Sequence, residues 1–373
     1  MKKHIFLATP HMSDEEYELA YVKQAFADNY VAPLGKNVDA FEQALSAYSG
    51  CDHVVALSAG TAALHLSVLL AGVKPGDTVF CQDLTFSASA NCVVYAGANP
   101  VFIDSERETW NMSPDALRKA FTRYGVPRAV IVVDLYGVPA KLDEIRALCR
   151  EHGTVLIEDA AEALGSTYKG QACGTFGKYG AYSFNGNKII TTSGGGALLC
   201  PTAEDAAQAL KLSTQAREPF PWYEHCQIGY NYRLSNISAG IGCGQMKVLP
   251  QRLAQKRRIF AAYQEKLANL PITMQPQESC AEANRWLSTF LLHADQRRQP
   301  MDIIRALGEA DIEARPLWKP MHMQPVFRDC PFVSCEETPV DEDLFARGVC
   351  LPSGTNLSDA DMERICAALY HAF

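Results

Sequence analysis

Short apolar runs alternate with segments of helical spacing along most of the chain. Continuous runs of five to seven residues, bounded by polar or glycine-containing segments, predict strands that are buried on both faces. Such strands are typical of a mostly parallel sheet between two layers of helices. The runs are HVVALS (53–58), TVFCQ (78–82), PVFID (100–104), AVIVVDL (129–135), TVLIED (154–159), GAYSF (180–184) and GALLC (196–200). The pattern therefore predicts an α/β fold around a mixed, mostly parallel seven-stranded sheet.

Helical patterns flank this strand-rich region on both sides. Residues 13–28 predict a helix with Ser13 as its N-cap and acidic residues in its first turn. Apolar positions from Lys247 to Leu267 predict a second helix, which leads into the C-terminal part of the chain. We expect a large domain over residues 1–246, including an N-terminal loop, and a small C-terminal α+β domain over residues 247–373.

Composition narrows the class of protein. The chain has 373 residues and a formal net charge of −8, which argues against a general nucleic-acid surface. Its 13 cysteines contain no C-x-x-C pair, so we expect neither a metal site nor a disulfide framework. No signal peptide and no run long enough to cross a bilayer is evident, so we expect a cytoplasmic protein without a membrane partner.

Polar residues gather where the predicted strands end, which is where ligands bind in such sheets. Gly60 and Thr61 open a helix after the first strand, and unpaired amides there favour an anion. Asp159 and Ser183 end two later strands, and Lys188 stands in a loop before three glycines. A lysine held in a shaped pocket can anchor a carbonyl cofactor as a Schiff base. Taken singly, these residues could equally be helix caps or solvated loop positions.

The combination is more specific than its parts. The order of these features resembles that of the DegT/DnrJ/EryC1/StrS sugar aminotransferases. It runs from a strand to Asp159, then through a second strand to Ser183-Phe184, and then to Lys188 before Gly-Gly-Gly. This family is a branch of the fold-type I pyridoxal phosphate enzymes, and the resemblance extends over nearly the whole chain. It implies pyridoxal 5'-phosphate as cofactor, Lys188 as its catalytic anchor and Asp159 as the partner of its ring nitrogen.

The resemblance also implies further cofactor contacts. Gly60, Thr61 and Ser183 match positions that hold the cofactor phosphate, and Phe86 matches the residue whose ring stacks on the pyridine. Asn231, in GYNYR, matches an asparagine that reaches the phosphate in the neighbouring subunit, so a homodimer with shared active sites is expected. Glu162 stands where glutamine or histidine is common beside the phenolic oxygen, and a carboxylate there would repel a phenolate unless it were protonated or paired.

Substrate contacts are expected from three segments. The loop of Asn29, Tyr30, Val31 and Ala32 could simply connect two elements. It matches, however, a family segment that touches the nucleotide sugar. Arg233 could supply a cation for an anionic group, and two residues of the C-terminal part, Arg315 and Lys319, could pair with a pyrophosphate or carboxylate. His322 could contact the sugar. Each of these charged side chains could equally serve a structural ion pair.

The strings EDAAEALGS, SFNGNKIITTSGGG, GYNYRLSN and RPLWKPMH resemble one subgroup most. That subgroup transfers the amino group of L-glutamate to UDP-4-keto-6-deoxy-N-acetylglucosamine, which gives UDP-4-amino-4,6-dideoxy-N-acetylglucosamine for bacillosamine-type glycans. One alternative is a 3-aminotransferase acting on a dTDP-linked keto sugar. A non-catalytic cofactor-binding regulator is a second alternative. Sugar 3-dehydratases of this fold are disfavoured, because they carry histidine at the position of Lys188.

Overall fold

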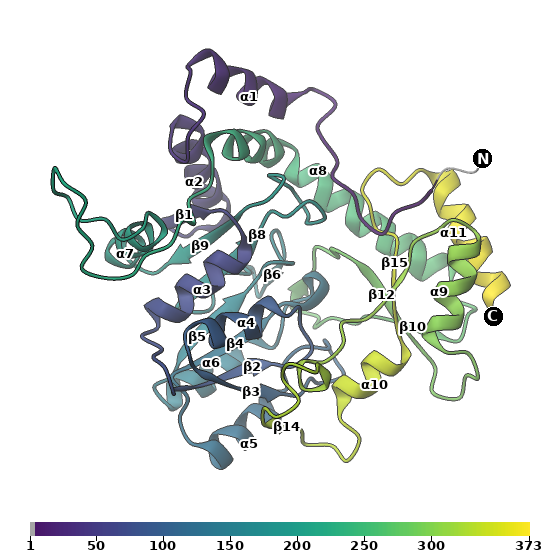
Figure 1. The fold of residues 1–373 in the computed structure, drawn as a ribbon. Helices are drawn as coiled ribbons and strands as arrows, with labels where there is room; N and C mark the ends of the chain where they lie inside the picture. The colour runs from purple at the N-terminus through teal and green to yellow at the C-terminus, as the bar shows by residue number, and fades with distance from the viewer. Residues whose placement is uncertain (1–3) are drawn as a thin grey trace.

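The computed structural model describes residues 4–373, and its central element is an eight-stranded sheet in the order β1-β9-β8-β5-β4-β2-β3-β14 (Figure 1). The strands are β1 (His53–Leu57), β2 (Thr78–Gln82), β3 (Asn99–Ile103), β4 (Ala129–Val133), β5 (Val155–Asp159), β8 (Tyr179–Ser183), β9 (Gly196–Cys200) and β14 (Phe332–Val333). All pairs are parallel except those that β9 makes with β1 and β8. The predicted seven-stranded, mostly parallel sheet is thus confirmed. The two-residue strand β14, from the C-terminal part of the chain, was too short to be predicted.

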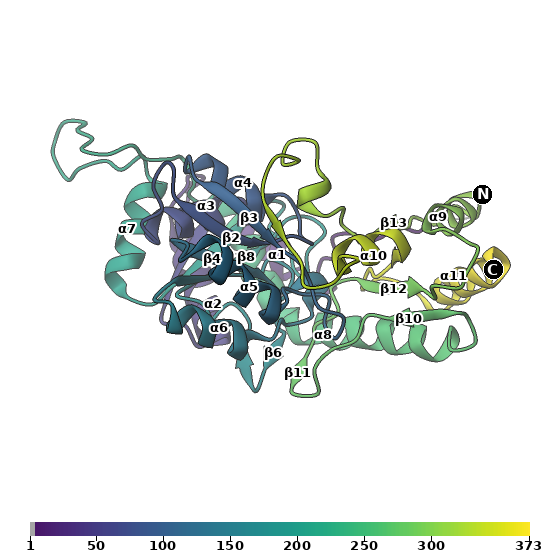
Figure 2. The same ribbon diagram turned by 90° about the horizontal axis from the view of Figure 1, so that it is seen from below.

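Helices cover both faces of the sheet, which explains why its strands are continuously apolar (Figure 2). One apolar cluster joins one face to α3 (Gly60–Leu70), α4 (Ala88–Tyr95) and α7 (Ala203–Ser213). A second joins the other face to α2 (Lys36–Ser49), α5 (Pro114–Tyr124), α6 (Leu142–Glu151) and the first half of α8 (Asn236–Lys266). Along β4 and β5, Ile131 and Ile157 belong to the first cluster, whereas Val130 and Val132 belong to the second.

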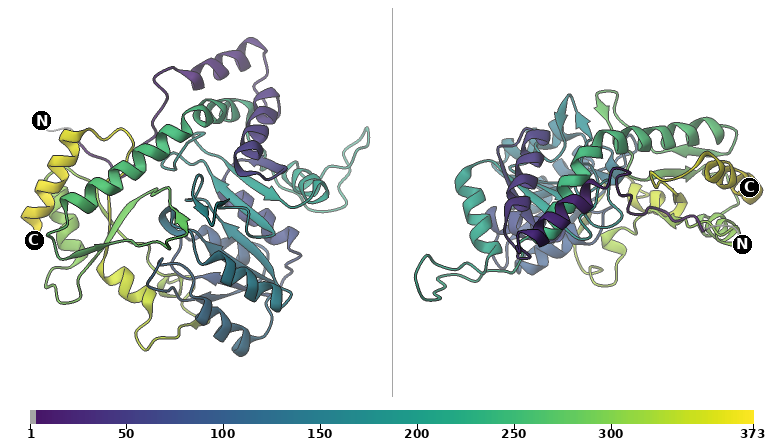
Figure 3. Two further views of the ribbon diagram at one scale, coloured as in Figure 1. Left: turned by 180° about the vertical axis from the view of Figure 1, so that it is seen from behind. Right: turned by 90° about the horizontal axis from the view of Figure 1, so that it is seen from above.

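The C-terminal part contains a second sheet in the order β10-β12-β15-β13, next to α9, α10 and α11. These elements are β10 (Ile272–Met274), β12 (Ser288–Leu292), β13 (Arg315–Pro316), β15 (Gly348–Leu351), α9 (Pro300–Glu309), α10 (Val340–Arg347) and α11 (Asp359–Ala372). The 31-residue helix α8 runs from the large sheet into this part (Figure 3). Position 246, where we predicted the division into two domains, therefore lies inside a continuous helix.

Two predicted helix starts were wrong. The first helix, α1 (Tyr17–Ala27), begins four residues after Ser13, although the Ser13 hydroxyl still accepts a bond from the Tyr17 amide at 2.9 Å. Helix α8 begins at Asn236, well before position 247. Its first turns are rich in glycine, which weakens a helical pattern in sequence. Here glycine permits close packing, since a Cβ at Gly242 would stand 2.6 Å from the Phe41 ring.

The remaining short elements lie in connections. They are β6 (Thr167–Tyr168), β7 (Gln171–Ala172), β11 (Ala281–Glu282) and the 3₁₀ turns η1 (Leu135–Gly137) and η2 (Met321–Met323). Ile5 lies beside the C-terminal part, where it bridges Ile312. Across residues 4–373, no helix combines the length and apolar character needed to span a bilayer.

Candidate active site

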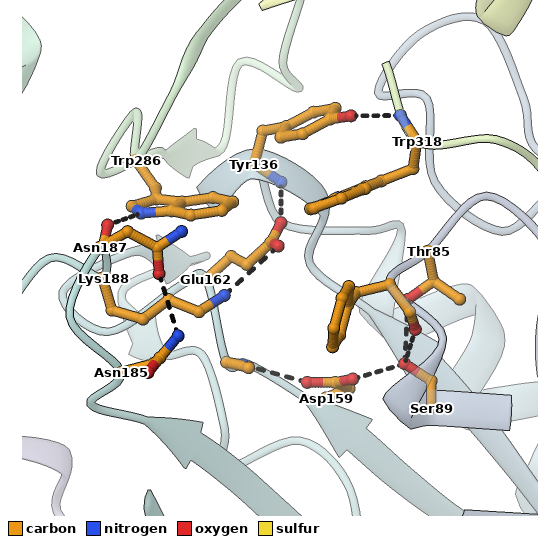
Figure 4. Close-up of polar contacts among 12 residues, drawn as sticks. Thr85, Ser89, Tyr136, Asp159, Glu162, Asn185, Asn187, Lys188, Trp286 and Trp318 are labelled. Carbon is orange, nitrogen blue, oxygen red and sulfur yellow. Dashed lines mark hydrogen bonds and ion pairs between the residues drawn. The ribbon is translucent and has the colours of Figure 1, made fainter. Parts of the chain in front are cut away.

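A cavity of about 400 Å³ opens where the strands of the large sheet end (Figure 4). Loops that follow β1, β2, β5 and β8 line it, and two tryptophans from the C-terminal part close one side. Seven of the residues predicted to bind the cofactor line this one cavity: Gly60, Thr61, Phe86, Asp159, Glu162, Ser183 and Lys188. They are spread over more than 120 positions of sequence, so the fold brings them together.

One end of the cavity is shaped for an anion. Helix α3 begins at Gly60, and its N-cap, Ala59, has no side chain that could bond the first amides. Those amides and the helix dipole favour a negative group there. Ser183 stands against this helix end, because a Cβ added to Gly60 would lie 3.2 Å from the Ser183 hydroxyl oxygen. Only glycine keeps the backbone this close to the serine.

A buried carboxyl group, Asp159, lies at the end of β5. Its two oxygens accept bonds from the Ser89 hydroxyl at 2.6 Å and from the Ala161 amide at 3.1 Å. Burial raises the pKa of Asp159, and these two bonds together with the charge of Lys188 offset part of that rise. A carboxylate held in this way can pair with a protonated ring nitrogen. Ser89 was not predicted, although it lies in the first turn of α4, three residues after Phe86.

Lys188 reaches into the cavity beside a second buried carboxyl group, that of Glu162 (Figure 4). The Lys188 Nζ lies 3.4 Å from Glu162 Oε1, and the Tyr136 amide donates to Glu162 Oε2 at 2.7 Å. Burial raises the pKa of Glu162, an effect that the nearby ammonium and the Tyr136 amide oppose. Both oxygens of the carboxyl are therefore paired, which is one of the two conditions under which a carboxylate beside a phenolate would not repel it.

Three stacked rings form the wall that sequence reasoning missed. Tyr136 lies between Trp286 and Trp318, with ring centres 6.4 Å apart on each side, and its hydroxyl accepts a bond from the Trp318 amide. Phe86 tilts against Trp318 at 5.4 Å. Tyr136 follows β4, so the strand-end rule could have found it, but no sequence signal connects the tryptophans to this cavity.

The cavity has the parts that pyridoxal phosphate requires. An amine stands at Lys188, a buried acid at Asp159 and an anion-binding helix end at Gly60, all around one space. The exposed ring of Phe86 borders the same space and could stack on a planar ligand. These residues therefore fit the cofactor that the resemblance implies.

A second cavity of about 640 Å³ adjoins the first, and Asn187, Trp286 and Trp318 border both. Arg315 and Lys319, two of the predicted substrate residues, line this second cavity. The guanidinium of Arg315 is bonded to the carboxylate of Glu313 at 2.8 Å. The joined cavities offer room for a ligand larger than the cofactor, with cations at the outer end.

The other predicted substrate residues do not line either cavity in this chain. The loop of Asn29, Tyr30, Val31 and Ala32 lies between α1 and α2, and Asn236 at the start of α8 bonds its Tyr30 and Ala32 backbone. Most of this loop is exposed, and Val31 is 58% accessible. It is therefore free to meet a ligand or another chain.

Arg233 and His322 are engaged in ion pairs instead. The Arg233 guanidinium lies 3.1 Å from Oε1 of Glu42, a partly buried carboxylate. His322 bonds Asp83 at 2.5 Å through Nδ1, and its ring stacks on Phe332. Burial alone would lower the pKa of His322, but the Asp83 carboxylate raises it overall. In these positions both side chains hold segments of the protein together.

Asn231 also lies outside the cofactor cavity of its own chain. It is exposed and forms an isolated bridge with Thr214 beside α7. The following segment toward α8 contacts the large sheet, where Arg233 bridges Leu57. A contact between Asn231 and a cofactor would therefore have to be made in a second copy.

Comparison with known proteins identifies the family of this chain. Residues 12–370 match the DegT/DnrJ/EryC1/StrS aminotransferase family. The chain is 50% identical to the candidate pyridoxal phosphate-dependent aminotransferase EpsN of Bacillus subtilis (strain 168), across 100% of this chain and 97% of that protein. It is 34% identical to the GDP-perosamine synthase of Caulobacter vibrioides, across 98% and 97%. The crystal structure of the aminotransferase TlmJ from Streptoalloteichus hindustanus superimposes with a TM-score of 0.89 at 28% identity, covering 99% of this chain and 98% of that one.

Proposed function

The chain belongs to the DegT/DnrJ/EryC1/StrS aminotransferase family and is a pyridoxal phosphate-dependent sugar aminotransferase, and on that premise we propose its substrates. We propose that it moves the amino group of L-glutamate to the C4 ketone of UDP-4-keto-6-deoxy-N-acetylglucosamine. The product would be UDP-4-amino-4,6-dideoxy-N-acetylglucosamine, a precursor of bacillosamine-type glycans. The observation that carries the reaction type is the single cavity that joins Lys188, Asp159 and the start of α3.

The residues of this cavity have separate tasks. Pyridoxal phosphate supplies an electron-withdrawing ring and an aldehyde that accepts amines. Lys188 would hold the cofactor at its aldehyde, and its amine would serve as the acid-base group that carries a proton during transfer. Asp159 would place a negative charge at the ring nitrogen, and the start of α3 with Ser183 would hold the phosphate. Trp286 and Trp318 exclude water from the reacting end.

Two features support a nucleotide-linked ketone as acceptor. The adjoining cavity presents the cations Arg315 and Lys319 where a diphosphate could be bound, and its aromatic wall could contact a sugar or base. Glu162 matches the subgroup that acts on the UDP-linked 4-ketone rather than the broader family. One relative is named a GDP-perosamine synthase, so the experiment below compares UDP-, GDP- and dTDP-linked sugars directly.

We also propose a homodimer with shared active sites. Residues 217–229 project beyond α7 as an arm, which all views show extending from the body (Figure 1). The arm carries exposed apolar side chains, among them Tyr223 at 77% and Ile228 at 82% accessibility. Exposed apolar residues of this kind mark contact surfaces. The arm leads directly to Asn231, so a neighbour that covered it would be close to that amide.

We propose that the enzyme acts in the cytoplasm, because all 13 cysteines of the chain are free in the structure. Free thiols persist in reducing compartments. Secretion assays with a tagged chain would test this proposal.

Mass spectrometry tests the proposed reaction directly. The purified protein, loaded with pyridoxal phosphate and given L-glutamate and the UDP-linked 4-ketone, should form the 4-amino sugar and 2-oxoglutarate. The matched dTDP-linked 3-ketone and GDP-linked 4-ketone should react more slowly. The Lys188→Ala variant is the control for background. Turnover of the dTDP-linked 3-ketone alone would overturn the substrate and leave the aminotransferase chemistry in place.

A further inference from the structure

Glu162 is the residue of this cavity whose part in the chemistry is unassigned. Its side chain is 5% exposed, and both oxygens have partners: the Lys188 ammonium at 3.4 Å and the Tyr136 amide at 2.7 Å. Tyr136 holds a left-handed backbone conformation with φ of 56°, which aims its amide at the carboxylate. The Glu162 carboxylate is thus fixed between a backbone donor and the reacting amine.

The other face of the Lys188 amine offers no base. The Trp286 ring lies 4.1 Å from Nζ, and its only polar atom, Nε1, already donates to the Asn187 carbonyl. An indole can stabilise a cation but cannot take its proton. Across residues 4–373, the one hydrogen bond of the Lys188 amine is the bond to Glu162.

Three titratable groups face this pair from the surrounding elements. Asp159 on β5 is bonded to Ser89 and Ala161. Tyr136 after β4 and Cys350 on β15 stay protonated, because burial raises the pKa of the thiol to about 12 and that of the phenol well above its usual range. If the Lys188 proton left for bulk water, Asp159 and Glu162 would remain as two carboxylates in one buried space without a cation. Such a state is strongly unfavourable.

We propose that Glu162 is a catalytic acid-base residue that receives the proton of Lys188 when the amine becomes a nucleophile and returns it when the amine is released. This inference rests on Lys188 being the cofactor anchor. In the step, one N–H bond of the ammonium breaks, its electron pair stays on nitrogen, and an O–H bond forms on Glu162 Oε1. Charges of +1 and −1 become two neutral groups, so the charge of the cavity does not change. Burial, which raises the pKa of Glu162, favours the same direction.

Calorimetry in buffers of different ionisation enthalpy counts the protons exchanged when pyridoxal phosphate binds to the apoprotein. At about pH 8, the Glu162→Gln variant should release up to about one proton per site more than the wild type, because it has no internal acceptor. Glutamine keeps an oxygen for the Tyr136 amide, so a purely structural role predicts equal counts. Glu313→Gln removes a carboxylate from the adjoining cavity that is paired with Arg315 instead, and it should match the wild type.

An infrared measurement on the wild type covers the case in which the variant fails to fold. Binding of the cofactor should add a carbonyl band of a protonated carboxyl group to the difference spectrum. Equal proton counts in wild type and Glu162→Gln, or the absence of this band, would overturn the proposal. Neither measurement uses sugar or glutamate. Failure of the anchor itself would show separately, as an unchanged visible spectrum in Lys188→Ala.

Discussion

The Nζ atom of Lys188 lies 4.1 Å from the centre of the Trp286 ring, while the indole Nε1 donates to the carbonyl of Asn187, the preceding residue, at 2.7 Å. One side chain therefore contacts the reactive amine and the backbone that carries it. Trp286 is 1% exposed and belongs to the C-terminal part of the chain. The position of Lys188 consequently depends on how that part packs against the large sheet.

Removing only the indole N–H should loosen this contact. Trp286→Phe keeps an aromatic face for the amine but leaves the Asn187 carbonyl without its donor. We expect a loss of about 1 kcal/mol in the free energy of unfolding. Misplacement of the amine should lower kcat by about tenfold. Urea unfolding and steady-state kinetics measure the two effects, and Trp222→Phe in the exposed arm is the control. Unchanged kcat in Trp286→Phe would show that the ring alone positions Lys188.

Replacing the buried acid should remove most of the activity. Asp159→Asn is isosteric but cannot hold a negative charge at a ring nitrogen, so kcat/KM should fall by roughly a hundredfold or more. Near-normal kcat/KM in this variant would exclude the proposed role.

The pH dependence of kcat/KM tests the Asp159 carboxyl group without removing it. The Ser89 hydroxyl stabilises the ionised form of Asp159, so in Ser89→Ala the pKa of the carboxyl should rise beyond the increase that burial causes. In the proposed role activity needs the ionised form of Asp159, so the acidic limb of the kcat/KM profile should move to higher pH. Ser87→Ala, at the N-cap of the same helix, is the control, since the Ser87 side chain makes no capping bond to α4. A profile identical to the wild type would contradict the assignment.

A methyl group at position 60 should weaken cofactor binding. The Cβ of Gly60→Ala would stand 2.8 Å from the Ser183 Cβ, so the helix end and the serine must separate. We expect the Kd for pyridoxal phosphate to rise by about tenfold or more, measured by absorbance titration. Gly308→Ala in α9, where an added Cβ meets nothing within 4 Å, should leave the Kd unchanged. Equal affinity in both variants would argue against a phosphate site at α3.

A buried lysine makes the stability depend on pH. Lys256 on α8 donates to the carbonyls of Trp286 and Ser353, and burial lowers its pKa to about 7. In the unfolded chain the amine titrates near its ordinary value of 10.5. Between these two values the unfolded state binds more protons, so the free energy of unfolding should increase with pH by up to about 1.4 kcal/mol per unit.

The Lys256→Met variant isolates this effect. It loses two bonds and should be less stable at every pH, but the slope that the amine contributes above pH 7 should disappear. Urea unfolding across this range measures the slope, with the exposed Lys247→Met on the same helix as control. A variant that keeps the wild-type slope would show that Lys256 is charged in the folded protein at higher pH.

The shared active site can be tested at Asn231. If this amide reaches the cofactor of a second copy, Asn231→Ala should weaken cofactor retention by about tenfold without changing the absorbance maximum. The exposed Asn356→Ala is the control. Sedimentation analysis should find dimers for both variants. Wild-type retention in Asn231→Ala would exclude the contact, and a monomeric wild type would exclude the arrangement as a whole.

Local pattern and the geometry of strands determined much of this protein. Seven apolar runs predicted seven strands, because a strand covered on both faces must be apolar throughout. The carboxyl ends of parallel strands meet at one edge, so Gly60, Asp159 and Ser183 could be expected in one place. The structure brings them and Lys188 to one cavity. The roles of these residues came from resemblance and stay proposals.

Only the tertiary structure decided which partners the polar and aromatic residues take. Sequence shows that Trp286 is aromatic and His322 titratable, but not that one covers Lys188 while the other is bonded to Asp83. Such contacts join positions roughly a hundred or more residues apart, and no local propensity encodes them. They arise when the C-terminal part packs on the sheet, because burial then requires each polar group to find a partner. Glu162 and Lys188 are only 26 positions apart, but their pairing also depends on the fold, which brings together the loops after β5 and β8.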